Sequence, residues 1–231
     1  MSSFISNLRE NNRLSVTVIL AMSCLLSVSI EAFRVYYSGF NTYLFLIWNL
    51  FLAILPYVIS TFFLLYYKKI NSLILTGIIL TSWLLLFPNA PYIVTDFFHL
   101  DQKAGIPYWY DLGMILSFAW NGLILGFISL YDIQTALQRR FGAFKGWAFA
   151  IFSLVLGSFG IYLGRYERFN SWDVLTNPVE LFVDIANRFI HPMQHPRTML
   201  MTLLFSVVLI FGYVTLVVMF KPGRIEKNNS R

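Results

Sequence analysis

Six apolar runs, separated by short charged joints, set the strongest limit on what this sequence can fold into. Most of them are about twenty residues long, which is the length of helix that crosses about 30 Å of hydrocarbon while satisfying its own backbone hydrogen bonds. The composition agrees, because 58% of the 231 residues are hydrophobic and 12% are charged, against roughly a quarter charged in a soluble domain. The sequence therefore predicts an all-α polytopic bundle that forms one integral membrane domain over residues 1–231. The expected crossings are 14–30, 43–67, 72–87, 112–131, 147–163 and 199–220.

The formal charge of +6 does not indicate a nucleic-acid partner, because the basic residues flank the apolar runs and form no patch of their own. Eleven of the 17 Lys and Arg residues lie in the two termini and in the joints after the second and fourth crossings. Eight of the 11 acidic residues lie in the other joints. The positive-inside rule therefore predicts a cell-membrane protein with both termini in the cytoplasm.

The first apolar run is expected to be a retained helix and not a signal peptide, because no small-x-small cleavage pattern follows it. Glu31 and Arg34 end this run one turn apart, so they are expected to pair with each other. Cys24 is the single cysteine, which excludes an intramolecular disulfide and a cysteine-based metal site.

The stretch WLLLFPNAPYIVTDFFHL, residues 83–100, carries the most informative local pattern. Pro88 and Pro91 lack a backbone N–H and disfavour helical geometry in the preceding residue, so the third crossing should break there. Asn89 is then expected to cap a short re-entrant or interfacial helix over 92–100. Helical spacing places four polar or aromatic side chains of that helix on one face: Tyr92, Thr95, Asp96 and His99.

Two later features concern packing and the membrane surface. Residues 177–191 alternate apolar and charged side chains with helical spacing, which is typical of an amphipathic helix lying in the membrane surface. Small residues recur with spacings of three or four, a pattern that lets membrane helices approach closely. These are Gly113, Ser117 and Asn121; Gly122 and Gly126; and Gly157, Gly160 and Gly164.

The motifs PNAPYIVTDFFHL, PYWYDLGM and GRYERFNSWDV resemble those of a bacterial family of multi-pass membrane proteins known as domain of unknown function 1361. The resemblance covers most of the chain from the second crossing onward. It implies an integral membrane protein and carries no established activity. Matched residue by residue, it points to Asn89, Pro91, Tyr92, Thr95, Asp96, His99, Trp109, Asp111, Arg165, Arg168, Asn170, Ser171, Trp172 and Asp173.

The chemistry of this candidate site stays open at the level of sequence. Asp96 and His99 have a spacing that allows them to share a proton or a metal ion. A metal would need further ligands, for which the candidates are Asp111, Glu167 and Asp173. Arg165 and Arg168, with Asn170 and Ser171 beside them and Trp172 next in the chain, are expected to hold a phosphate or carboxylate group. The alternative is structural, in which Asp96 pairs with Arg165 or Arg168.

Three hypotheses for the function follow. In the first, an outward-facing polar pocket binds an anionic lipid or cell-envelope molecule, and in an enzymatic version modifies it with Asp96 or His99 handling the proton. In the second, the same polar groups lock a non-catalytic membrane scaffold or accessory subunit. In the third, the protein is a small transporter or permease with a water-accessible path. The sequence does not decide whether the protein is an enzyme, and it identifies no cofactor.

Overall fold

The computed structural model describes residues 13–70, 72–101, 105–169 and 173–219, and within these ranges every regular element is helical. The longer helices are α2 (Arg13–Ser38), α3 (Phe45–Tyr66), α4 (Leu73–Leu86), α6 (Tyr108–Phe141), α7 (Ala143–Tyr162), α9 (Pro178–Ile190) and α10 (Pro196–Met219). The short ones are α5 (Asn89–Tyr92), the 3₁₀ helix η1 (Ile93–His99), the π-helical turn η2 (Leu163–Glu167), α8 (Asp173–Thr176) and the 3₁₀ turn η3 (Pro192–Gln194).

Six segments in the described part of the chain are long and apolar enough to cross a membrane. They are Arg13–Ser38, Phe45–Tyr66, Leu73–His99, Tyr108–Phe141, Ala143–Glu167 and Pro196–Met219. These segments match the six apolar runs of the sequence, and the expected all-α polytopic bundle is confirmed. The chain is a multi-pass integral membrane protein.

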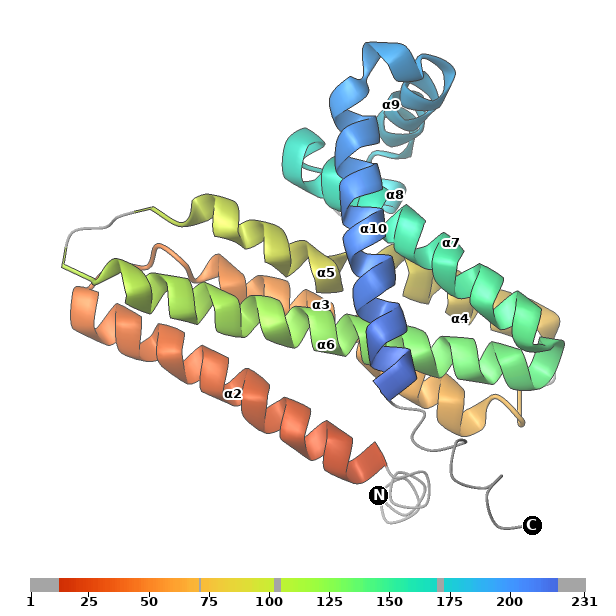
Figure 1. Ribbon diagram of the computed structural model, residues 1–231, viewed down its shortest axis with the longest axis horizontal. Helices are drawn as coiled ribbons and strands as arrows, with labels where there is room; N and C mark the ends of the chain where they lie inside the picture. The colour runs from red at the N-terminus through yellow and green to blue at the C-terminus, as the bar shows by residue number, and fades with distance from the viewer. Residues whose placement is uncertain (1–12, 71, 102–104, 170–172, 220–231) are drawn as a thin grey trace, which may run out of the picture.

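Helix α6 forms the centre of the bundle and runs beside α2 and α3 (Figure 1). A chain of hydrogen bonds joins α4, α6 and α3 in its core: the Trp83 indole nitrogen donates to the Ser129 hydroxyl over 2.6 Å, and that hydroxyl donates to the Pro56 carbonyl over 2.9 Å. Helix α10 packs antiparallel to α7, and the Tyr213 hydroxyl also bonds to the Gln134 side chain of α6. The core therefore contains polar groups whose hydrogen bonds are met by neighbouring helices.

The helix that contains the fourth crossing is longer than the predicted crossing of 112–131, since α6 has 34 residues and spans about 50 Å. The sequence did not predict this extension of the helix past 131, because the polar residues that follow were taken for a joint. They remain helical, and their polar groups find partners on other helices: Asp132 pairs with Arg13, and Arg140 donates to the Ile70 carbonyl and the Thr76 hydroxyl. Gly142, with φ of +96°, then ends the helix in a conformation that L side chains rarely adopt.

The amphipathic helix expected over 177–191 is α9, which begins with Pro178 at its first turn. Its inner side contributes the buried Leu181 to a cluster with Phe159 and Leu163 of the α7 segment. Its outer side exposes Val179, Phe182, Val183 and Ile190, which are 55 to 73% accessible. An apolar outer side of this kind suits a helix in contact with lipid.

Candidate functional site at the end of the third crossing

The third crossing breaks at the two prolines, as the sequence predicts, and then continues. Helix α4 ends at Leu86, α5 begins at Asn89, and η1 runs to His99. Asn89 does not cap this segment, because the cap position is Pro88 and carries no side-chain hydrogen bond. Asn89 Nδ2 instead donates to the Leu86 carbonyl over 2.9 Å, at the point where the break removes helical donors. The segment after the prolines extends the crossing alongside α3.

Glycines of α7 and η2 let this broken segment lie directly against them. A Cβ added at Gly160 would fall 2.8 Å from the Pro88 ring, and one added at Gly164 would fall 3.0 Å from the Tyr92 ring. The predicted role of Gly160 and Gly164 in close packing is thus confirmed. The contact matters for the site because Gly164 is followed directly by Arg165, which is thereby placed beside η1.

Arg165 meets all four side chains that the sequence places on one face of the segment after the prolines. Its guanidinium donates to Asp96 Oδ1 over 2.5 Å and to the Thr95 hydroxyl over 2.6 and 2.9 Å. Its Nη1 lies 2.6 Å from His99 Nε2, and its Cζ lies 4.6 Å from the centre of the Tyr92 ring. Two segments about seventy residues apart therefore form one cluster, which we call the Arg165 cluster: Tyr92, Thr95, Asp96, His99 and Arg165.

The hydrogen bonds of this cluster assign different roles to its acid and its imidazole. Asp96 is 1% exposed, and its second oxygen accepts a hydrogen bond from Asn49 Nδ2 over 2.8 Å, so both oxygens are engaged. A guanidinium can only donate hydrogen bonds, so His99 Nε2 must be the acceptor and the imidazole is neutral in this arrangement. His99 is exposed, so its imidazole is the group of the cluster that lies open to solvent.

The other candidates from the second motif lie apart from the Arg165 cluster or outside the described residues. Arg168 is exposed and has φ of +61°. Glu167 pairs with Arg188 over 2.8 Å, and Asp173 opens α8 and accepts a hydrogen bond from Thr176. Asn170, Ser171 and Trp172 lie outside the residues that the structure describes.

The residues proposed as metal ligands do not converge. In the described ranges, no three His, Cys, Asp or Glu side chains gather in a way that would hold a metal ion. Asp111, Glu167 and Asp173 contact other partners, and Asp96 and His99 are left without a third protein ligand. The spacing of the Asp96–His99 pair was a valid signal for a shared face, but the partner on that face is a guanidinium.

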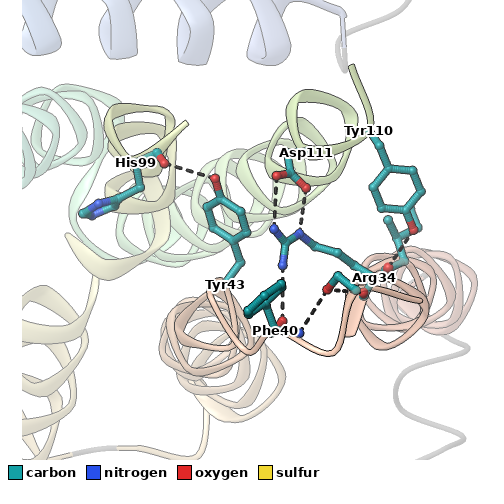
Figure 2. Close-up of polar contacts among 8 residues, drawn as sticks. Arg34, Phe40, Tyr43, His99, Tyr110 and Asp111 are labelled. Carbon is teal, nitrogen blue, oxygen red and sulfur yellow. Dashed lines mark hydrogen bonds and ion pairs between the residues drawn. The ribbon is translucent and has the colours of Figure 1, made fainter. Parts of the chain in front are cut away.

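A second ion pair, which the sequence did not reveal, joins α2 to α6 (Figure 2). Arg34 was expected to pair with Glu31, but it donates to both oxygens of Asp111 over 2.7 and 3.2 Å, and both side chains are buried. The guanidinium stacks 4.6 Å from the Tyr43 ring centre, and the Tyr43 hydroxyl donates to the His99 carbonyl over 3.1 Å. Tyr43 thereby connects the Arg34–Asp111 pair to the backbone of the Arg165 cluster.

Arg188 fastens α9 to the helices beneath it. It donates to both oxygens of Asp184 over 2.8 and 2.9 Å, and to the Tyr162 and Thr198 hydroxyls over 3.1 Å each. The hydrogen bonds to Asp184 raise the pKa of the Arg188 guanidinium above its ordinary value. The charged Arg188 guanidinium thus holds α9 against α7 and α10.

A cavity of about 350 Å³ lies next to the Arg165 cluster, between α3, α4, α7 and α9. Its wall is mostly apolar, with a few polar groups near the proline break. The lining residues on which the argument depends are Asn49, Asn89, Tyr92, Leu156, Gly164 and Leu181. Tyr92 belongs both to this wall and to the Arg165 cluster, so the apolar cavity and the charged cluster share one side chain.

Comparisons with known proteins match the chain to one family and assign no activity. The model of a family described as "Protein of unknown function (DUF1361)" matches residues 48–211, which is more than half of the chain. The match includes the proline break, the Arg165 cluster and α9. No curated protein and no solved structure matches the chain.

Proposed function

Because the chain belongs to the DUF1361 family, whose description carries no activity, its function has to be argued from its own residues, and we propose that it binds an anionic amphipathic molecule in the membrane. The ligand class is an anionic lipid or a lipid-linked envelope precursor. Its apolar part would occupy the 350 Å³ cavity, and its acidic group would lie at the Arg165 cluster. The protein would act in a bacterial cell membrane.

The observation that carries this proposal is the adjacency of the apolar cavity to a buried guanidinium. Ligand sites are typically cavities of about 300–1,000 Å³ with mostly apolar walls and a few well-placed polar groups. Tyr92 and Gly164 line the cavity, while the Tyr92 ring lies under the Arg165 guanidinium. A molecule with an acyl chain and a phosphate or carboxylate matches this pairing, because arginine binds such groups through forked hydrogen bonds.

Each member of the cluster then has a separate task. Asp96 orients Arg165 by accepting a hydrogen bond from its guanidinium, and Asn49 holds Asp96 in place by donating to its other oxygen. An arriving anion would approach Nη1 of Arg165, where it competes with His99 for the same donor. In an enzymatic version, the displaced His99 imidazole would accept or donate the proton. Asp96 is a positioning residue in this scheme, because both of its oxygens are already hydrogen-bonded.

The distribution of charge supports one orientation in the membrane. The termini and the joints after the second and fourth crossings hold most of the Lys and Arg residues, which favours a cytoplasmic location for them. With six crossings, the end of the third crossing and the end of α7 then face outward. The ligand would accordingly come from the outer leaflet.

Native mass spectrometry of the full-length protein in nanodiscs tests the proposal. The nanodiscs would contain an anionic phospholipid and a zwitterionic one in equal amounts. We expect the wild type to retain the anionic lipid selectively, and Arg165→Gln to lose that selectivity. Arg197→Gln is the matched control, because Arg197 is exposed and contacts the Tyr166 ring outside the cluster; it should retain the selectivity.

A second pair of variants tests the cavity. Leu156→Trp places a larger side chain in the cavity wall and should reduce retention of both lipids. Leu116→Trp, on an exposed position of α6 that does not line the cavity, should not. Equal retention in all four variants would overturn the proposal. Purification with a stoichiometric protein partner and no bound lipid would favour a scaffold. If variants of the Arg165 cluster lost a cellular phenotype only in proportion to their lower protein level, the cluster would be structural.

A further inference from the structure

Glu31 is a buried carboxyl group that takes part in none of the ion pairs found among the described residues. It lies on α2 one turn before Arg34 and is 0% exposed. Among the described residues, neither of its oxygens has a hydrogen-bond partner. Arg34, the nearest basic residue on the same helix, gives two hydrogen bonds to Asp111 of α6 instead.

This arrangement has a definite charge balance. Arg34 and Asp111 neutralise each other, so an ionised Glu31 would add a net negative charge to the buried interface of α2 and α6. An unpaired carboxylate in a low-dielectric interior is so costly that the group takes up a proton instead. Ionisable side chains inside membrane segments are rare for the same reason, and those present are commonly functional.

We propose that Glu31 is a proton-binding site, in which the bound proton and the Arg34 guanidinium are alternatives. While Glu31 is protonated, Arg34 stays with Asp111. When Glu31 releases its proton to water, its carboxylate competes with Asp111 for Arg34, which lies within reach on the next turn of α2. The reaction is a proton transfer alone, and no other group is consumed. This inference does not depend on lipid binding.

The route that the proposal requires would begin at a cavity lined by neighbours of Glu31, although Glu31 itself does not line it. A cavity of about 160 Å³ at the end of α2 is lined by Phe33, Arg34, Tyr37, Ile106, Pro107 and Tyr110. The Tyr110 hydroxyl donates over 2.8 Å to the Ile30 carbonyl, which immediately precedes Glu31 (Figure 2). The titratable and charged groups around Glu31 are therefore Arg34 on its own helix, Tyr110 and Asp111 on α6, and Tyr43 beside Arg34.

The proton site is connected to the Arg165 cluster through Tyr43. Movement of Arg34 from Asp111 toward Glu31 would remove the guanidinium from the Tyr43 ring. The Tyr43 hydroxyl holds the His99 carbonyl, so the change would reach the backbone at the end of η1 (Figure 2). Proton release at Glu31 would thus loosen the α2–α6 contact and the support of His99 together.

Infrared difference spectroscopy of the full-length protein in nanodiscs tests this inference. At neutral pH we expect the wild type to show the carbonyl stretch of a protonated carboxylic acid, and Glu31→Gln to lose one equivalent of it. Glutamine has nearly the shape of the protonated acid, so this variant should fold. An unchanged carboxylic-acid band in Glu31→Gln would overturn the proton site.

Asp111→Asn tests the competition for Arg34 separately. It removes the competing carboxylate, so Arg34 should pair with Glu31 and ionise it, and the same band should disappear although Glu31 is present. Persistence of the band in Asp111→Asn would overturn the exchange. The thermal midpoint gives a second readout. A carboxyl group that binds its proton more tightly when folded loses stability as pH rises, so a fall in the wild-type midpoint between mildly acidic and alkaline pH should be smaller in Glu31→Gln.

Discussion

Replacing Asp96 by asparagine should destabilise the fold by about 3 kcal/mol, because it leaves Arg165 without its counter-charge. The side chains of Asp96 and Arg165 are 1% and 10% exposed, so their ion pair belongs to the buried class. Breaking such a pair from one side typically costs about 3–5 kcal/mol. Asparagine keeps one oxygen that accepts from the guanidinium, and this places the expected cost at the lower end. The folding equilibrium should shift by about a hundredfold.

The assay is reversible unfolding of the purified protein in mixed micelles, followed as a function of the denaturing detergent fraction. Glu180→Gln is a control at an exposed carboxylate and should change the free energy of unfolding by less than about 0.5 kcal/mol. Arg165→Met combined with Asp96→Asn should recover part of the loss, because no buried charge is then left unpaired. A cost for Asp96→Asn below about 1 kcal/mol, the range of exposed ion pairs, would refute the reasoning.

Two further predictions concern packing. Gly122→Ala should destabilise the protein by about 1–3 kcal/mol in the same unfolding assay, because the added Cβ would lie 2.5 Å from the Ala90 carbonyl oxygen. Gly113→Ala is the control and should not destabilise the protein, because a Cβ there would meet no atom within 4 Å. Equal effects of the two substitutions would contradict the packing. Arg188→Ala should speed amide hydrogen exchange in α9 several-fold and leave α6 unchanged, since Arg188 joins α9 to α7 and α10. Arg197→Ala is its control, and protection of α9 that is the same in both variants would show that Arg188 does not hold the helix.

Those features of the fold and the site that depend on interactions between residues near each other in the chain could be predicted from the sequence. Hydrophobic runs of membrane-crossing length predicted the six crossings, and the missing donors of Pro88 and Pro91 predicted the break in the third. Helical spacing grouped the side chains that meet Arg165, and it did so although η1 is a 3₁₀ helix. A face defined by spacings of three and four survives this change, because both helix types bring residues i and i+3 near each other.

The features that the sequence did not reveal depend on contacts between distant segments. Glu31 is one turn from Arg34, yet Arg34 pairs with Asp111, 77 residues away. The continuation of α6 past 131 was not predicted, because Asp132 looked like a joint residue until its partner Arg13 was known. A polar side chain such as Asn49 inside a membrane helix is expected to hydrogen-bond to another helix, but nothing in its neighbourhood indicates that its partner is Asp96. Such pairings carry no periodic signal along the chain.

Gly113 illustrates the same limit in the opposite direction. Its spacing from Ser117 and Asn121 predicted a close helix contact, but a Cβ at Gly113 would meet no atom within 4 Å. Asn121 does join α6 to α2, through a hydrogen bond of 2.9 Å to the Ser27 hydroxyl. A small-residue pattern therefore marks a face that can pack closely, whereas the partner decides which of its residues are used.

The account depends most directly on the Arg165 cluster facing the outer side of the membrane. The test is labelling of intact cells with a membrane-impermeant thiol reagent, using His99→Cys in a chain whose single cysteine is removed by Cys24→Ser. Arg139→Cys, at an exposed position near the end of α6, is the control for the cytoplasmic side. The account predicts that His99→Cys is labelled in intact cells and Arg139→Cys only after permeabilisation. The reverse pattern would contradict it.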